Sequence, residues 1–149
     1  PNQIMGVYDK SLVEPIANVL KGLNSRHVMV VHSEDGLDEF SIANTTYVAE
    51  LKDNNISTYT VHPGDFGLEE GNLDSIKAEN AEQSLALINE AFSGKKGVAR
   101  DIIALNAGAA IYVSGLVSSF DEGVTQANQI LSDGSAQDKL DAYILASNS

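Results

Sequence analysis

The residues best suited to chemistry lie in one short acidic segment, from Glu34 to Glu39, in which four of the six residues carry carboxylates. No Lys or Arg occurs between Arg26 and Lys52 to neutralise this charge locally. Carboxylates held side by side repel one another unless they are solvated or share a cation. Mg²⁺ is commonly held by one or two carboxylates together with substrate phosphates. The adjacent residues Asp38 and Glu39 are therefore candidate magnesium ligands.

A second interpretation of this segment stays open on the residues alone. An acidic run after a strand is most often a solvated loop without a ligand. The segment also lacks the Asp-x-Asx-x-Asx-Gly repeat of an EF-hand calcium loop. Gly36 gives the backbone the freedom that a turn requires. A magnesium site and a solvated loop thus remain alternatives.

The other polar residues form no recognised catalytic arrangement. The three histidines, His27, His32 and His62, have no HExxH-like partner, and no GxSxG pattern occurs. His32 ends an apolar run, so it is either a site residue or a polar strand terminus bonded to a neighbouring loop. His27 and His62 are predicted at the surface or in turns. Asn106, within an apolar run, is predicted to be a satisfied core amide.

The acidic segment follows what the sequence predicts to be a βαβ unit. Residues 3–8 are largely apolar and partly β-branched, and residues 26–32 contain an almost unbroken apolar run, so both are predicted to be strands. Helical periodicity covers residues 10–22. Ser11 and Glu14 have the spacing of a capping box. Strand, helix and strand at this spacing favour a parallel pair. Ligands of such sheets bind beyond the carboxyl ends of the strands, which is where the acidic segment falls.

The rest of the chain predicts a hairpin followed by helices. Two β-rich runs, 45–51 and 56–61, flank turn residues and form an antiparallel hairpin candidate, so the sheet should be mixed. Helical patterns follow at about residues 80–94, 97–116, 121–131 and 135–146, with Gly134 as a break. Gly94-Lys95-Lys96-Gly97 matches no phosphate-binding motif and is better explained as a helix end with a basic turn. The apolar run 102–113 is shorter than the ~20 residues of a membrane span and predicts a buried core helix.

Composition narrows the function classes further. The 149 residues include 9 basic and 21 acidic ones, a formal net charge of −12, which excludes binding to a nucleic-acid backbone by bulk electrostatics. The chain contains no cysteine, so thiolate chemistry is excluded and a cytoplasmic location fits. No signal peptide is visible, and the start at Pro1 indicates a processed product or a piece of a longer protein.

Several segments in order resemble the anthranilate phosphoribosyltransferase family over essentially the whole chain. They are Pro1–Tyr8, Leu12–Pro15, Val30–His32 with Asp35–Glu39, Asp65–Leu68, Glu79–Ala81 and Arg100–Ala110. The resemblance implies an α/β fold with a mixed, mainly parallel sheet flanked by helices. Residues 1–149 would be the incomplete C-terminal part of the phosphoribosyltransferase/nucleoside-phosphorylase-like large domain. The N-terminal helical domain and the family's Gly-Thr-Gly-Gly-Asp phosphate loop are absent here.

The same resemblance implies a function. The family transfers phosphoribose from phosphoribosyl diphosphate to anthranilate in tryptophan biosynthesis, with Mg²⁺ as cofactor, and is typically a homodimer. By position, Asp38 and Glu39 match the family's magnesium ligands, whereas no residue here matches a general base or nucleophile. We expect no membrane partner and an isolated chain without activity. A pyrimidine-nucleoside phosphorylase-like enzyme and a non-enzymatic divalent-cation-binding module remain the alternatives.

Overall fold

The computed structural model describes residues 1–148 and contains one four-stranded sheet in the order β1-β2-β3-β4. Its strands are β1 (Asn2–Gly6), β2 (His27–Ser33), β3 (Thr46–Lys52) and β4 (Asn55–Val61). β1 and β2 pair in parallel, whereas β2–β3 and β3–β4 are antiparallel. The expectation of a mixed sheet is confirmed. The expectation of a mainly parallel sheet is wrong for these strands, because only β1 and β2 are joined by a helical crossover.

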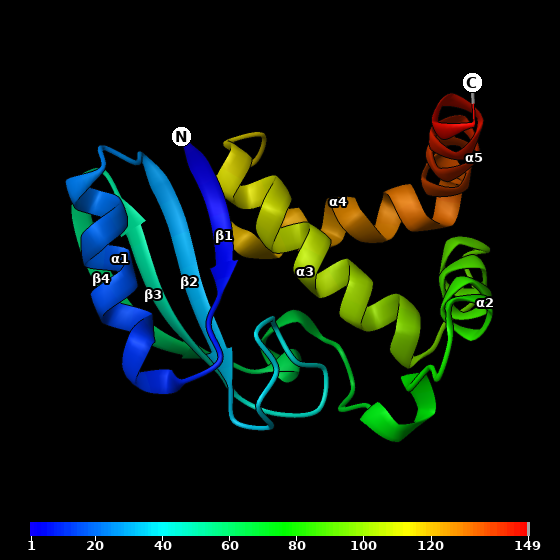
Figure 1. The fold of residues 1–149 in the computed structure, drawn as a ribbon, viewed down its shortest axis with the longest axis horizontal. Coiled ribbons are helices and arrows are strands. Elements are labelled where there is room, and N and C mark those ends of the chain that lie inside the picture. Colours follow the sequence, from blue (N-terminus) through cyan, green and yellow to red (C-terminus); the bar gives the residue numbers. More distant parts are fainter. Residues whose placement is uncertain (149) are drawn as a thin grey trace.

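One face of the sheet is covered by α1 (Val13–Gly22), which follows the short 3-10 helix η1 (Lys10–Leu12) (Figure 1). The predicted helix is confirmed, but its predicted capping box is not. Asp9, rather than Ser11, caps the chain here, because its carboxylate accepts hydrogen bonds from the Ser11 N–H and hydroxyl. The apolar side chains between α1 and the sheet form a continuous core that includes Val13, Ala17, Leu20, Val28, Val30, Ala49 and Leu51.

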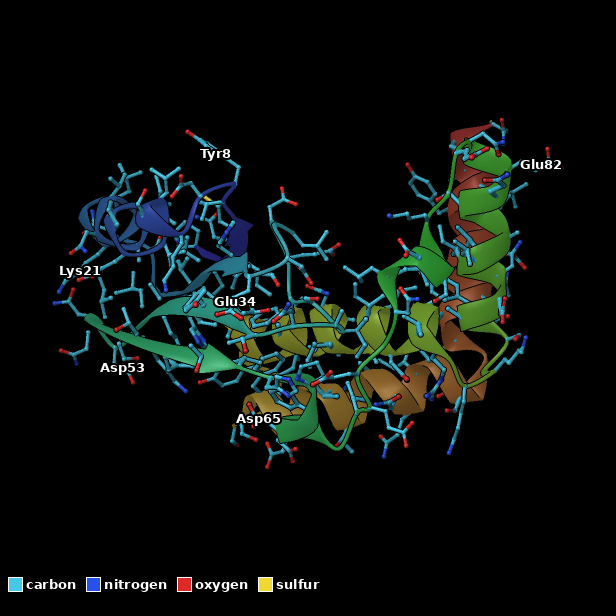
Figure 2. All side chains as sticks on the ribbon, turned by 90° about the horizontal axis from the view of Figure 1, so that it is seen from below. Tyr8, Lys21, Glu34, Asp53, Asp65 and Glu82 are labelled. Carbon is cyan, nitrogen blue, oxygen red and sulfur yellow. The ribbon has the colours of Figure 1, made fainter. Side chains whose placement is uncertain are left out.

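The β3–β4 hairpin turns through two residues, Asp53 and Asn54. Both have left-handed backbone angles, with φ of 50° and 62°. Asp and Asn tolerate this region better than most residues, and two such residues in succession match the twist of the flanking strands. The predicted hairpin is therefore confirmed, and Asp53 lies at its tip (Figure 2).

The opposite face is covered by α3 (Val98–Ser114), which contains the apolar run 102–113 as a largely buried helix, as predicted. The next helix, α4 (Phe120–Asp133), packs closely against α3, with direct contact between the backbones of the two helices. A Cβ on Gly123 would lie 2.2 Å from the Gly108 carbonyl oxygen. The glycines therefore allow the two helices to approach closely. Residues from α3, α4, three strands and the loop between β2 and β3 share this core: Met29, Val31, Phe40, Val48, Val61, Leu105, Ala109, Tyr112, Val113 and Val124.

Two further helices, α2 (Ala81–Phe92) and α5 (Ser135–Ser147), lie at the end of the molecule away from the sheet (Figure 1). Asn80 caps α2, and its Oδ1 accepts from the Gln83 N–H at 2.9 Å. Gly134, with φ of 87°, separates α4 from α5. Short 3-10 helices, η2 (Pro63–Phe66) and η3 (Leu73–Ile76), connect the hairpin to α2. Within residues 1–148, no helix combines the length and apolar character that crossing a membrane requires.

A buried polar cluster joins the sheet to α3 at the start of β2. Glu50 accepts hydrogen bonds from the hydroxyls of Tyr59 and Tyr112, each at 2.8 Å, and pairs with His27 Nε2 at 2.7 Å. Lys52 donates to the Tyr112 hydroxyl at 3.0 Å. Burial and the charge of Glu50 raise the pKa of Tyr59. The prediction that His27 is a surface or turn residue is wrong, because the first residue of β2 faces this cluster and is buried.

We expect Glu50→Ala to lower the free energy of unfolding by about 3 kcal/mol, because the buried His27 and Tyr112 side chains and the more exposed Tyr59 hydroxyl would lose their shared acceptor. Glu50→Gln keeps one acceptor oxygen and should cost about 1 kcal/mol. Urea unfolding followed by circular dichroism measures both. Equal losses for the two variants would contradict the role of the shared acceptor.

Candidate functional site

The acidic segment begins the loop of residues 34–45, which runs from the carboxyl end of β2 to the start of β3. Because β1 and β2 are parallel, their carboxyl ends meet at this edge of the sheet. Figure 1 shows the loop, in light blue to cyan, below the arrowhead of β1. Figure 2 shows Glu34 at this edge, while Tyr8, after β1, projects away from the protein. The predicted position of the acidic segment is therefore confirmed.

A tight turn at the start of the loop sends the chain back toward β1. The Gly36 N–H donates to the Ser33 carbonyl at 2.9 Å, and the Ser33 N–H donates to the Leu37 carbonyl at 2.9 Å. Gly36 has a φ of 89°, a backbone angle that glycine adopts without a steric penalty. The turn brings residue 38 beside the end of β1.

Gly6, the last residue of β1, contacts the backbone of Asp38. A Cβ at Gly6 would lie 1.5 Å from the Asp38 carbonyl oxygen and 2.5 Å from its carbonyl carbon. No other residue type fits this approach without moving the loop. The path of the acidic loop therefore depends on a glycine that lies 32 positions earlier in the chain.

On its other side the loop is bonded to α3 by Asn106. The Asn106 Oδ1 accepts from the Phe40 N–H at 2.9 Å, and its Nδ2 donates to the Phe40 carbonyl at 2.8 Å. The prediction that Asn106 is a satisfied amide is confirmed, although the residue is partly buried rather than fully in the core. Its partner is the residue directly after Glu39, so the amide is also part of the structure that surrounds the acidic pair.

The first two carboxylates of the segment are engaged by neighbouring side chains. Asp35 accepts from the Ser41 hydroxyl and, at 3.3 Å, from the Leu37 N–H. Glu34 accepts from the Tyr47 hydroxyl. These bonds hold the loop together and give Glu34 and Asp35 a structural role.

The other two carboxylates, on Asp38 and Glu39, are exposed and make no hydrogen bond or ion pair within residues 1–148. Partial burial of the Glu39 carboxyl, and then repulsion from Asp38 and Asp35, raise its pKa. A cation between the two carboxylates would relieve this repulsion. The pair is therefore free to bind a ligand.

The donor set indicates which kind of cation fits. In the described part of the chain, no group of three or more His, Cys, Asp or Glu side chains could enclose a metal ion. A site with two carboxylates suits Mg²⁺, which keeps several waters and takes further oxygens from substrate phosphates. Asp38 and Glu39 could hold such an ion if water or a bound phosphate completed its coordination.

The remaining histidines have structural partners. His32 Nδ1 donates to the Val7 carbonyl at 2.8 Å. Of the two interpretations of His32, the structure therefore supports a polar strand terminus bonded to a neighbouring loop. His62 caps η2 and pairs with Glu70 at 3.0 Å, in agreement with its predicted place in a turn. The segment from Gly94 to Gly97 ends α2 and precedes α3, which confirms its interpretation as a helix end with a basic turn.

The sequence of this chain matches the model of a known protein family over most of its length. The profile described as "Glycosyl transferase family, a/b domain" matches residues 1–137, which include the sheet, the acidic loop and α3. The chain belongs to this family. The glycosyl transferase profile thus covers every residue of the candidate site.

Individual relatives within the glycosyl transferase family are similar over nearly the whole chain. Over 144 residues, 97% of this chain, it is 61% identical to the anthranilate phosphoribosyltransferase of Ruthia magnifica subsp. Calyptogena magnifica. The enzyme of the same name from Vesicomyosocius okutanii subsp. Calyptogena okutanii is 59% identical over 144 residues. In both cases the matched region is 42% of the relative, so the chain spans about two fifths of the length of these relatives. The resemblance noted from the sequence is confirmed.

Solved structures agree with the fold. Anthranilate phosphoribosyltransferase from Thermus thermophilus superposes with a TM-score of 0.85 at 32% identity, over 94% of this chain and 41% of that one. The Saccharomyces cerevisiae enzyme in complex with PRPP and Mg superposes with a TM-score of 0.81 at 27% identity, over the same shares of the two chains. The α/β fold is therefore that of part of these enzymes.

Proposed function

We propose that this chain is the C-terminal part of an anthranilate phosphoribosyltransferase, and that Asp38 and Glu39 hold Mg²⁺ against phosphoribosyl diphosphate. The observation that carries the proposal is the 61% identity to a relative of that name over 97% of the chain. The unengaged carboxylate pair at the carboxyl ends of β1 and β2 supports it. A helical N-terminal domain and a glycine-rich phosphate loop belong to the rest of the proposed enzyme.

The reaction explains why a carboxylate pair is useful here. A bond forms between the anthranilate amine nitrogen and C1 of the ribose, the C1–oxygen bond breaks, and diphosphate leaves with the bonding electron pair. The amine nitrogen releases one proton to solvent. Bound Mg²⁺ supplies positive charge to the leaving diphosphate oxygens. Asp38 and Glu39 hold and orient that charge, and positioning with electrostatics supplies the rate enhancement without a covalent nucleophile.

The charge of the chain makes a cation necessary. With a formal net charge of −12, the chain repels a polyanionic substrate. Two carboxylates that have no cationic partner within residues 1–148 add to this repulsion at the site. Asp38 and Glu39 would hold a divalent ion, whose positive charge would offset this repulsion and attract the diphosphate. We further propose that the whole enzyme acts in the cytoplasm as a homodimer, without nucleic-acid or membrane partners.

A chimera tests the proposed function. The matching segment of the Ruthia magnifica enzyme would be replaced by this chain, and product formation from anthranilate and phosphoribosyl diphosphate would be followed by fluorescence. We expect Mg²⁺-dependent turnover by the chimera and none by the isolated chain, which lacks the phosphate loop.

Two controls separate the alternatives. A chimera that folds, as shown by circular dichroism and gel filtration, but does not turn over would contradict the proposal. Cleavage of a pyrimidine nucleoside with inorganic phosphate would favour the phosphorylase instead. Tight Ca²⁺ binding by the isolated chain without any phosphate would favour the non-enzymatic module.

A further inference from the structure

The Asn106 side chain pairs with the backbone of Phe40 in the way that a neighbouring strand would. Its Oδ1 accepts the Phe40 N–H at 2.9 Å and its Nδ2 donates to the Phe40 carbonyl at 2.8 Å. The same Nδ2 donates to the Ile102 carbonyl, one turn earlier in α3, at 3.0 Å. The amide is thus bonded at once to its own helix and to both polar backbone groups of residue 40.

Packing adds to this attachment. The Phe40 side chain is fully buried, and its ring centroid lies 5.0 Å from that of Phe120. On the other side of the acidic pair, the Asp38 carbonyl lies against Gly6, which has no room for a side chain. The backbone of Asp38 and Glu39 therefore runs between two fixed points, Gly6 and Phe40.

We propose that Asn106 is a positioning residue that sets the direction of the Asp38 and Glu39 carboxylates toward the metal and the diphosphate. This inference rests on the proposed function. The two carboxylates have no partner of their own within residues 1–148, so only the flanking backbone fixes where they point. Loss of the Asn106 bonds would free residue 40 and widen the range of orientations of both carboxylates.

The chain offers a matched control in α4. Asn128 is half-buried like Asn106, and its Nδ2 donates to the carbonyl of residue Val124, one turn earlier, at 3.2 Å. Its side chain makes no bond to the acidic loop. Asn106→Ala and Asn128→Ala therefore remove the same kind of side chain and the same local bond, and only the first removes the attachment of Phe40.

The experiment measures Mn²⁺ binding by electron paramagnetic resonance in the active chimera, with phosphoribosyl diphosphate present. We expect Asn106→Ala to raise the Mn²⁺ dissociation constant about tenfold, in the range of losses seen when groups supporting metal ligands are removed. Asn128→Ala should leave it within twofold of the parent. The Mg²⁺ concentration for half-maximal rate should shift in parallel, while kcat at saturating Mg²⁺ stays within about threefold of the parent, because a positioning role is compensated by excess metal.

The experiment distinguishes a failure of the proposed function from a failure of the proposed role of Asn106. A parent chimera that shows no Mn²⁺ binding dependent on phosphoribosyl diphosphate overturns the proposed function. A parent that binds Mn²⁺, with equal dissociation constants for the two alanine variants, overturns the role of Asn106 alone. Urea unfolding of both variants provides the stability control. If metal affinity fell in proportion to the free energy of unfolding in both variants, Asn106 would have a structural role only.

Discussion

The double variant Asp38→Asn with Glu39→Gln should lower kcat/KM for phosphoribosyl diphosphate about 100-fold at limiting Mg²⁺, equivalent to roughly 3 kcal/mol of transition-state stabilisation. The amide oxygens keep the shape of the side chains but lose the charge that holds a divalent ion. Since neither carboxylate bonds to another part of residues 1–148, the stability of the fold should change little. Steady-state rates across a Mg²⁺ titration provide the measurement.

The control for this variant is a second pair of adjacent carboxylates. Glu69 and Glu70 are both exposed and lie after η2, outside the acidic loop. Glu69→Gln with Glu70→Gln removes the same two charges, and we expect it to leave the Mg²⁺ dependence unchanged. If the two double variants behaved alike, the effect would come from net charge, and Asp38 and Glu39 would no longer be the proposed ligands.

Gly6→Ala is the second substitution with a large expected effect, because a single methyl group would overlap the Asp38 carbonyl oxygen at 1.5 Å. The clash is with backbone, so it cannot be relieved by a side-chain rotation. Overpacking of this kind costs about 1–3 kcal/mol, and we expect about 2 kcal/mol in the free energy of unfolding. The loop must also move, so metal affinity in the presence of phosphoribosyl diphosphate should fall more than tenfold.

Gly22→Ala is the matched control, because a Cβ at Gly22 meets nothing within 4 Å. Gly22 is the last residue of α1, where alanine has the better helix propensity. We expect this variant to be at least as stable as the parent and to bind metal normally. Normal metal binding by Gly6→Ala would show instead that the loop tolerates a shift of residue 38 without consequence for the site.

Short stretches of sequence were enough to predict those helices and strands whose turns or caps are formed by neighbouring residues. The β3–β4 hairpin depends on Asp53 and Asn54, and α2 begins at Asn80, so both could be predicted from short stretches. The orientation of β2 against β3 depends instead on the path of the long loop between them, which no short stretch predicts. The mainly parallel sheet that the family resemblance implied is not found among these four strands. The partner of His27 lies 23 residues away on β3, which explains why a surface position was predicted.

The candidate site, too, could be predicted from the sequence only in part. Carboxylate density made Asp38 and Glu39 candidate ligands, but it could not show that Glu34 and Asp35 are hydrogen-bonded while Asp38 and Glu39 have no partner within residues 1–148. That distinction depends on Tyr47 and Ser41, whose contacts arise only in the folded chain. Asn106 contacts residue 40 across 66 positions. Its one signal in the sequence was an amide in an otherwise apolar helix, which did not indicate its partner.

The contacts that hold the acidic loop on both sides of the pair involve backbone groups of the loop, namely the Asp38 carbonyl at Gly6 and both polar groups of Phe40 at Asn106. Neither contact uses the carboxylate group of residue 38 or 39. Natural selection, or a protein engineer, can therefore exchange these two side chains for others with a different charge or a different metal preference while the loop keeps its course. One set of residues therefore determines the path of the loop, and a different set supplies the side chains that would bind a ligand.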